Sequence, residues 1–358
     1  MSFILIDDIM NLIMWWVKDN MYEQTTKCPL LINGEANNPG FAKELFWEYQ
    51  KEAIKAPKWK IKEWDYYLIT NDDMGVALTM DNNSYMGLMS MSLLDFKNRK
   101  EKTVSKIIPL TFDKIKFPET SETGDIYYED KNCRFSFKND HGKRILEATM
   151  YKFIDDINVR VEVVIDRTPK ESMVILTPFD KKYHFYYNQK IVGMEARVKI
   201  NYGAKLIEMK KAFATLDWGR GVWTYDNTWI WGSANILLDN HKFGFNIGYG
   251  FGDTSKASEN MIFYDEKAHK IDRIKAIIKQ KDAKDDFMAP WTITSNDKRF
   301  EMIFTPILDR AACTDIKILK SDQHQVFGYY NGYCVLDDNT KIEVKDCLGF
   351  IEKVVNKW

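Results

Sequence analysis

Short hydrophobic runs alternate with polar turn residues along most of the chain after residue 59. The first of these runs, residues 64–70, 75–80 and 85–93, are rich in β-branched, aromatic or apolar side chains. Asn71-Asp-Asp73 and Asp81-Asn-Asn83 separate them, and Asn and Asp favour tight turns. Runs of this length between turn residues are typical of strands joined as hairpins. This part of the pattern therefore predicts an antiparallel sheet.

The same pattern continues to the C-terminus. Residues 159–165, Val-Arg-Val-Glu-Val-Val-Ile, alternate apolar with polar side chains at first, which is typical of a sheet with one face in water. Parallel β-α-β units would need intervening helices, and the pattern contains few. We therefore expect an all-β, mainly antiparallel fold of barrels or sandwiches. Further expected strands lie at residues 133–137, 145–151, 229–236, 242–250, 299–305, 325–335 and 341–344.

Helical periodicity is confined to two segments. Residues 41–56 carry apolar side chains at positions 41, 42, 45, 46, 49 and 53, a spacing that predicts an amphipathic helix. Residues 349–357 show the pattern more weakly. The fold should therefore contain few, short helices.

The chain has 358 residues, which is long for one domain. We expect two barrel-like domains in tandem, and we place them at residues 21–195 and 196–358. No Pro/Gly/Ser-rich linker marks the boundary. Residues 1–20 are expected to form an N-terminal extension.

The N-terminal extension contains apolar residues interrupted by Asp7 and Asp8. It lacks the basic region and the small residues of a signal peptide, and it is too short and acidic to span a bilayer. Two interpretations stay open: an amphipathic segment that docks on the protein, and one that contacts a membrane peripherally. No other segment is long and apolar enough for an integral membrane span.

The net charge is −1, from 51 basic and 52 acidic residues, and no long basic block is present. Nucleic-acid binding needs a clustered basic surface, so we expect no nucleic-acid partner. Lys58, Lys60 and Lys62 alternate with other residues and are expected to form the polar face of a strand.

Cysteine and histidine patterns argue against disulfides and metals. The cysteines are odd in number and contain no CxxC pair, and the histidines contain no HxxxH or HExxH pair. Reduced thiols in a cytoplasmic protein are the better interpretation, and neither a zinc site nor another cofactor is expected. The cysteines are at positions 28, 133, 313, 334 and 347, and the histidines at 141, 184, 241, 269 and 324.

Aromatic residues make up 14% of the chain, and they surround a candidate polar site at residues 216–225. Asp217 and Arg220 lie three residues apart there, and a carboxylate and a guanidinium so close in sequence can pair. They can form an acid group and an anion anchor in an aromatic pocket. Alternatively, they are a structural ion pair that closes one end of a barrel.

Several tryptophans and tyrosines near this segment are candidates for the wall of a ligand pocket. Trp229 and Trp231 follow at strand spacing and so share one face. They can line a site for a flat or isoprenoid-like ligand, or they can simply fill a core. The full set of aromatic candidates is Trp218, Trp223, Tyr225, Trp229, Trp231, Tyr187 and Trp291.

A second polar group follows the glycine-rich run at residues 245–253. GxGxG is not the dinucleotide fingerprint and no β-α-β unit surrounds it, so we expect no nucleotide. Glu259 lies in sequence near Asn246, Tyr249 and Asn260, and burial can make such a carboxyl a general acid or base. The alternative is that these residues only cap loops and turns.

Several long motifs give the chain a family resemblance. From about residue 28 to the C-terminus it resembles a bacterial family known as domain of unknown function 2804. More distantly, its layout is similar to the paired lipocalin-like barrels of carotenoid hydratases and tocopherol cyclases. The motifs that carry the resemblance include Lys62-Glu-Trp-Asp-Tyr-Tyr67, Leu216-Asp-Trp-Gly-Arg-Gly-Val-Trp223, Asn246-Ile-Gly-Tyr-Gly-Phe-Gly-Asp253, Pro290-Trp291 and Gln325-Val-Phe-Gly328.

The resemblance implies a hydrophobic small molecule or lipid as the ligand, with acid/base chemistry and no metal or nucleotide. One hypothesis is a hydratase, cyclase or isomerase in which Asp217 or Glu259 donates the proton and Arg220 tunes the acid. The other is a non-catalytic carrier of a lipid-like ligand. The two differ in whether Asp217 and Arg220 line a cavity or lie sealed in the core.

Overall fold

The computed structural model describes residues 21–112, 114–316 and 319–357. The expected N-terminal extension, residues 1–20, and its docking or membrane contact lie outside these residues. The described chain divides into two compact units, an N-terminal unit of Glu23–Tyr225 and a C-terminal unit that contains Asp226–Trp358. Each unit is built on one large antiparallel sheet, so the predicted all-β, mainly antiparallel fold is confirmed.

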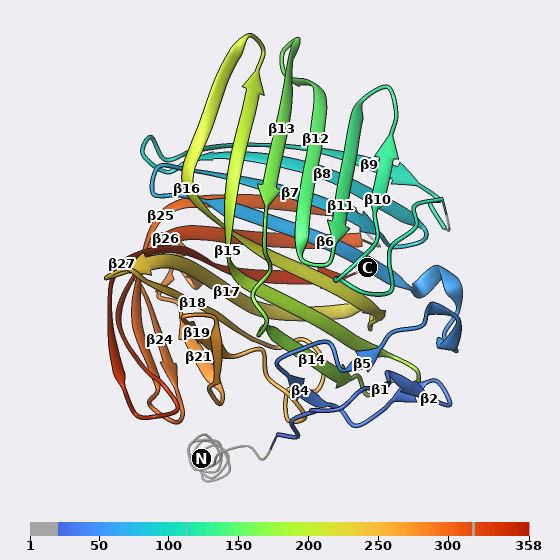
Figure 1. The fold of residues 1–358 in the computed structure, drawn as a ribbon, viewed down its shortest axis with the longest axis vertical. Coiled ribbons are helices and arrows are strands. Elements are labelled where there is room, and N and C mark those ends of the chain that lie inside the picture. The colour runs from blue at the N-terminus through green and yellow to red at the C-terminus, as the bar shows by residue number, and fades with distance from the viewer. Residues whose placement is uncertain (1–20, 113, 317–318, 358) are drawn as a thin grey trace. The chain divides into compact units, whose positions relative to one another are not determined.

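A twelve-stranded sheet forms most of the N-terminal unit (Figure 1). Its main path runs β10-β11-β12-β13-β15-β16-β6-β7-β8-β9, and β14 joins β15 to β4. β9, β10 and β4 are therefore its edge strands. In chain order the strands are β4 (Gly40–Ala42), β6 (Lys62–Thr70), β7 (Met74–Asn82), β8 (Met86–Asp95), β9 (Lys100–Pro109), β10 (Ile126–Glu129), β11 (Cys133–Asp140), β12 (Lys143–Ile154), β13 (Ile157–Ile165), β14 (Met173–Pro178), β15 (Phe185–Tyr202) and β16 (Lys205–Val222).

The rest of this unit is a set of short elements before β6. They form a parallel pair, β1 (Cys28–Pro29) with β5 (Trp47–Glu48), and a hairpin, β2 (Leu31–Ile32) with β3 (Glu35–Ala36). Two 3-10 helices follow, η1 (Lys51–Ala53) and η2 (Lys58–Lys60). They are the only helices in the described residues, as expected from the scarcity of helical periodicity.

A nine-stranded sheet forms the C-terminal unit, in the order β20-β19-β18-β17-β27-β26-β25-β24-β21. Every neighbouring pair in it is antiparallel. Its strands are β17 (Asp226–Leu238), β18 (His241–Tyr249), β19 (Met261–Tyr264), β20 (Lys267–Lys270), β21 (Ile274–Ile277), β24 (Trp291–Ser295), β25 (Phe300–Ile316), β26 (Leu319–Val335) and β27 (Lys341–Lys357), and β22 (Gln280–Lys281) pairs with β23 (Lys284–Asp285).

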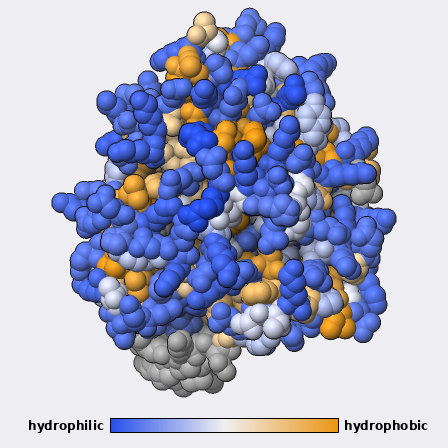
Figure 2. Space-filling model, in the orientation of Figure 1, coloured by the Kyte–Doolittle hydropathy of each residue, from blue (hydrophilic) through white to orange (hydrophobic). Residues whose placement is uncertain are grey.

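The alternation in the sequence has the expected structural cause. In β13 the side chains of Val159, Val161 and Val163 are buried, whereas Asn158 and Arg160 are exposed. Burying each such apolar side chain stabilises the fold by about 1.5–3 kcal/mol. On the face shown in Figure 2, hydrophilic residues cover most of the surface and hydrophobic residues form small groups. Ionisable groups in the interior are therefore the exceptions that need explaining.

The predicted helix over residues 41–56 is wrong. This segment forms β4, β5 and η1 instead. Phe41 and Ala42 pair with Ile175 and Val174 of β14, and the Trp47 indole donates to the Asn37 carbonyl oxygen at 2.8 Å. Tertiary hydrogen bonds therefore replace the helical ones, and such contacts commonly override local propensity. Residues 349–357, the weaker helical pattern, belong to strand β27.

The expected domain boundary at residues 195–196 lies inside β15. This strand pairs with β16 along almost its whole length, from Phe185 opposite Val222 to Tyr202 opposite Lys205. Because two strands of one hairpin share one sheet, the compact units divide after the hairpin, between Tyr225 and Asp226.

A glycine in β16 allows an aromatic ring to lie across the strand. Gly219 is directly opposite Trp64 of β6, and a Cβ at Gly219 would stand 2.0 Å from Trp64 Cζ2. The Trp64 ring stacks on Tyr186 with centroids 6.0 Å apart, and it meets Trp223 edge-on at 5.2 Å. These neighbours leave the ring little room to move away from a new side chain.

We predict that Gly219→Ala lowers the free energy of unfolding by roughly 1–3 kcal/mol, the usual cost of overpacking a core. Urea denaturation measures this. The matched control is the same substitution in a Trp64→Ala background, where the clash is absent and the cost should largely vanish. An equal cost in both backgrounds would contradict this explanation of the glycine.

Candidate functional site

The predicted pairing of Asp217 with Arg220 is wrong. Both residues lie in β16, and side chains three residues apart on a strand point to opposite faces. Arg220 is directly opposite Glu63 of β6, and Asp217 is directly opposite Lys190 of β15. The structure therefore contains two buried charge clusters, one on each face of the sheet.

Arg220 forms the centre of the first cluster, and its side chain is 0% exposed. Its Nη1 donates to Asp65 Oδ1 at 3.1 Å and to the carbonyl oxygens of Trp64 and Gly219 at 3.0 and 2.9 Å. Its Nε and Nη2 donate to the Pro118 carbonyl oxygen at 3.4 and 3.1 Å. A guanidinium has five N–H donors, one on Nε and two on each terminal nitrogen, so each of the three nitrogens of Arg220 donates to the protein.

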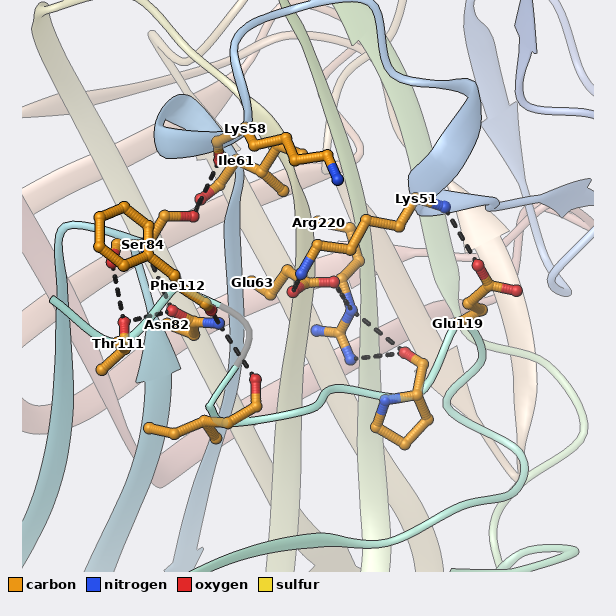
Figure 3. Close-up of polar contacts among 12 residues, drawn as sticks. Lys51, Lys58, Ile61, Glu63, Asn82, Ser84, Thr111, Phe112, Glu119 and Arg220 are labelled. Atoms are coloured by element: carbon orange, nitrogen blue, oxygen red, sulfur yellow. Dashed lines mark hydrogen bonds and ion pairs between the residues drawn. The ribbon is translucent and has the colours of Figure 1, made fainter.

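Glu63 extends this cluster to two chain segments outside the sheet (Figure 3). Its carboxylate accepts from Lys51 Nζ at 2.8 Å and from the Tyr49 hydroxyl at 3.1 Å. The Lys51 backbone N–H in turn donates to Glu119 at 3.0 Å. We call Arg220, Glu63, Asp65 and Lys51 the Arg220 lock, because they tie residues 49–51 and 118–119 to the sheet.

The electrostatics of the lock agree with a structural role. Burial raises the pKa of the Asp65 carboxyl, and the neighbouring Arg220 guanidinium opposes that rise. Trp218 lies against Arg220, with the guanidinium carbon 4.2 Å from the ring centroid, a cation–π contact. These observations support the second interpretation of the segment, an ion pair that closes part of the fold, although its acidic partners are Asp65 and Glu63.

Asp217 belongs to the second cluster, on the opposite face. Its Oδ1 lies 2.8 Å from Lys190 Nζ and accepts from Asn188 Nδ2 at 2.6 Å. The Lys190 and Asp217 side chains are 3% and 9% exposed. In such a pair each charge offsets part of the other's cost of leaving water.

The aromatic candidates of the N-terminal unit have different surroundings. Trp218 and Tyr187 are fully buried and meet edge-on, with centroids 5.4 Å apart. The Tyr187 hydroxyl donates to the Trp47 carbonyl oxygen at 2.8 Å, whereas the Trp218 indole N–H is buried without a hydrogen-bond acceptor among the described residues. Tyr225, at 54% exposure, lies at the surface.

In the C-terminal unit the structure brings four predicted site residues together. The Trp231 indole donates to Asn246 Oδ1 at 2.7 Å, and Asn246 Nδ2 donates to the Glu259 carbonyl oxygen at 2.9 Å. Asn260 accepts from the Gly248 N–H at 2.8 Å. The two Asn side chains therefore hold the chain after β18 against that strand, which agrees with the alternative of loop and turn hydrogen bonding.

The other three candidates of this unit also make structural contacts. The Trp229 indole donates to Glu352 at 3.0 Å, and the Trp291 indole donates to the Phe287 carbonyl oxygen at 3.1 Å. The Tyr249 hydroxyl accepts from the Ala276 N–H at 3.4 Å. The predicted site thus divides between the units: Asp217, Trp218, Arg220, Trp223, Tyr225 and Tyr187 in one, and Trp229, Trp231, Asn246, Tyr249, Glu259, Asn260 and Trp291 in the other.

A third group of polar residues was not predicted as a site. Lys62 begins β6, and its side chain is buried instead of lying on a polar strand face. Its Nζ lies 4.9 Å from the Tyr85 ring centroid and 4.8 Å from that of Trp223. The same nitrogen donates to the Tyr85 hydroxyl at 3.2 Å and to Asn83 Oδ1 at 3.3 Å.

Asp81 completes this group, which we call the Lys62 site (Lys62, Asp81, Asn83, Tyr85 and Trp223). The sequence predicts Asp81 in a turn, but the residue belongs to strand β7. It is buried, and its Oδ1 accepts from Asn83 Nδ2 at 2.5 Å. Asp81 is directly opposite Trp64, two residues from Lys62, so both ionisable side chains are on one face of neighbouring strands.

Burial shifts both ionisable groups of the Lys62 site toward their neutral forms. Desolvation lowers the pKa of Lys62 to about 8, and the Asp81 charge opposes this shift. Desolvation likewise raises the pKa of Asp81 to about 7, opposed by Lys62 and by the Asn83 hydrogen bond. Burial, followed by the Asp81 charge, also raises the pKa of Tyr85. Burial thus moves the pKa of the amine and that of the carboxyl toward each other.

Comparison with known proteins gives a family and a fold. A family model described as "Domain of unknown function (DUF2804)" matches residues 21–358. No curated protein matches the chain. A structure from Nitrosomonas europaea, described as "a putative AttH", is similar with a TM-score of 0.55 at 12% identity, covering 91% of this chain and 98% of that one. This likeness concerns the fold alone.

A second similar structure is kievitone hydratase from Nectria haematococca, with a TM-score of 0.49 at 8% identity. The match covers 83% of this chain and 88% of that one, and it is too distant to support an inference. Within the described residues, no group of three or more His, Cys, Asp or Glu side chains could hold a metal ion. In the same residues, no helix has the length and hydropathy needed to cross a membrane.

We predict that Arg220→Met lowers the free energy of unfolding by about 3–5 kcal/mol, because it leaves buried carboxylates without their cation. Limited proteolysis should also show faster cleavage near residues 118–119. The matched control is Arg197→Met, which removes an exposed ion pair with Asp166 and should cost at most about 1 kcal/mol. Equal stability of the two variants would contradict the structural role that we assign to the Arg220 lock.

Proposed function

The chain belongs to the family described as domain of unknown function 2804, and on that premise we propose that it is an enzyme of the hydratase, cyclase or isomerase type. It moves protons to and from an apolar small molecule, and Lys62, Asp81 and Tyr85 carry that chemistry. The single observation behind the proposal is the burial of Lys62 and Asp81 on one face of neighbouring strands beside the Tyr85 hydroxyl, which moves the pKa of the amine down and that of the carboxyl up.

Proton transfer is fastest when the pKa of the catalytic group lies near the working pH. Between pH about 7 and 8 the Asp81 carboxyl has lost its proton and the Lys62 amine still holds one, so Asp81 serves as the base and Lys62 as the acid. The Tyr85 hydroxyl, 3.2 Å from Lys62 Nζ, can relay a proton between the amine and a bound molecule. Perturbed pairs of this kind gather at functional sites more often than elsewhere.

The surroundings of the Lys62 site favour an apolar substrate. The Trp223 and Tyr85 rings flank the amine, and Trp64 packs against Trp223. Aromatic faces stabilise cations, so this environment also suits a positively charged intermediate. Free cysteines throughout the described chain support a cytoplasmic location.

The acids favoured by the sequence have weaker support. Asp217 is directly opposite and ion-paired to Lys190, and each nitrogen of the Arg220 guanidinium donates to the protein. Glu259 packs over Gly248, where a Cβ would stand 3.3 Å from its Oε2. We therefore assign Arg220 a structural role and keep Asp217 as the second candidate for the catalytic carboxyl.

The alternative function is a non-catalytic carrier of a lipid-like molecule. One observation favours it: the buried Trp218 indole N–H, which has no acceptor among the described residues. A buried donor without an acceptor costs about 1–3 kcal/mol, and a carbonyl or hydroxyl oxygen of a bound molecule would remove that cost. In this case Asp81→Asn should leave ligand binding unchanged.

Incorporation of solvent deuterium tests the proposed chemistry. The protein is incubated in D2O with a lipid extract from the organism that encodes it, and small molecules that gain carbon-bound deuterium are detected by mass spectrometry. We expect Lys62→Met and Asp81→Asn to reduce the rate at least about 100-fold, since acid/base groups contribute 10²–10⁴. The exposed control Asp166→Asn should retain the wild-type rate.

The rate should also follow a bell-shaped pH profile. Below pH about 7 the Asp81 carboxyl and the Lys62 amine both hold protons, so no base is left. Above pH about 8 both have lost them, so no acid is left. A lost rate in Asp217→Asn together with a retained rate in Asp81→Asn would contradict the assignment of Asp81 as the catalytic carboxyl.

A further inference from the structure

Three loops meet at one end of the sheet in the N-terminal unit. The strands β15, β16, β6, β7, β8 and β9 are neighbours in that order, and each neighbouring pair is antiparallel. The segments that precede β15 and β6 and the segment that follows β9 therefore lie at the same end of these strands, beside the turn between β7 and β8. We call the three segments, residues 57–61, 110–116 and 179–184, the lysine loops.

Hydrogen bonds to one residue of the β7–β8 turn hold two of the lysine loops together (Figure 3). The Ser84 hydroxyl donates to the carbonyl oxygens of Lys58 and Ile61 at 2.9 and 3.0 Å. The Ser84 carbonyl oxygen accepts from the Phe112 N–H at 2.7 Å. Segments that are far apart in sequence are thereby fixed next to each other at this end of the sheet.

The lysine loops carry an excess of positive charge. They contain six lysines, two aspartates and no arginine. Within the described residues, only one of the six lysines has an ion-pair partner, Lys182 with Glu35 at 3.5 Å. Desolvation, followed by the Lys181 charge, lowers the pKa of Lys60, so lysines of two loops are close enough for their charges to repel. The six are Lys58, Lys60, Lys114, Lys116, Lys181 and Lys182.

The opposite end of the same strands has no such excess. The β6–β7 turn at residues 71–73 and the β8–β9 turn at residues 96–99 together contain two acidic and two basic residues. The positive charge is therefore confined to one end of the strands, where it can attract an anionic partner.

Large apolar side chains are exposed among these lysines. Trp59, Leu110 and Phe112 are exposed to 53%, 57% and 46%. Lys60 Nζ lies over the Trp59 ring, 5.0 Å from its centroid. Tryptophan rings favour the headgroup level of a bilayer, and lysines can bury their methylene stems while the amines reach charged groups in water. The loops combine both residue types on one surface.

We propose that the lysine loops bind the surface of a lipid bilayer that carries anionic headgroups. The Trp59, Leu110 and Phe112 side chains enter the headgroup region, and the surrounding lysines attract the lipid phosphates. Such binding goes beyond the proposed function and does not depend on it.

The residue types favour a bilayer over a protein or a nucleic acid as the partner. Protein–protein interfaces are enriched in arginine and depleted in lysine. Nucleic-acid recognition relies heavily on the planar guanidinium, which makes paired hydrogen bonds to phosphates and bases. The lysine loops contain no arginine, whereas a diffuse negative surface attracts lysine and arginine alike.

Vesicle sedimentation tests this surface. The full chain is mixed with vesicles of phosphatidylcholine alone, or of phosphatidylcholine and phosphatidylglycerol in equal parts, and the bound fraction is measured after centrifugation. We expect binding to the anionic vesicles only, and weaker binding as salt is added. Lys58→Gln combined with Lys60→Gln should weaken it at least about 10-fold, and Trp59→Ser should weaken it at least about 5-fold.

Matched variants at the opposite end of the strands serve as controls. Lys97→Gln combined with Arg99→Gln removes the same charge from the β8–β9 turn and should leave vesicle binding unchanged. Leu206→Ser, at a residue of β16 exposed to 55%, controls in the same way for the loss of an apolar side chain. All of these variants should keep the wild-type Tm, because they change residues outside the buried core.

Three results would overturn the proposal. Equal binding to both kinds of vesicle would show that anionic headgroups are not recognised. Equal loss of binding in the two double variants would show that overall charge, not the lysine loops, determines it. Tighter binding to single-stranded RNA than to the anionic vesicles, lost when Lys58 and Lys60 are substituted, would make a nucleic acid the partner.

Discussion

The burial of the Arg220 guanidinium is the constraint on which the N-terminal unit depends. A cation removed from water costs several kcal/mol unless charge and hydrogen bonds replace the solvent. Arg220 meets this requirement with Asp65 and with carbonyl oxygens from β6, β16 and Pro118. The chain before β6 and the chain after β9 must therefore reach the sheet at this point.

The strands could be predicted from local patterns, because both the alternation of side chains in a strand and the turn residues that end it lie within a short segment. β13 alternates, and Asn71-Asp-Asp73 lies between β6 and β7 as expected. The segment at residues 41–56 failed because its partners are distant in sequence: Ala42 pairs with Val174. The periodicity of a segment depends on its own residues, so it cannot predict a hydrogen bond to a strand more than a hundred residues away.

The candidate site was predictable in part. Trp231, Asn246 and Asn260 do meet, because they lie on one hairpin and the chain that follows it. The predicted pairing of Asp217 with Arg220 was wrong because side chains three residues apart on a strand point to opposite faces of the sheet. The alternation of Lys58, Lys60 and Lys62 predicted the polar face of one strand, but Lys58 and Lys60 lie in η2 and Lys62 begins β6. Because β6 is buried on both faces, the Lys62 side chain lies in the interior.

The Arg220 lock and the Lys62 site are one peptide bond apart, because Glu63 follows Lys62 in β6. Adjacent strand residues face opposite sides, so fixing Glu63 with Arg220, Lys51 and Tyr49 on one side also fixes the backbone of Lys62 on the other. Catalytic groups work best when supporting contacts hold them before the substrate arrives. The Arg220 lock, which has a structural role, can thus determine where the Lys62 amine lies.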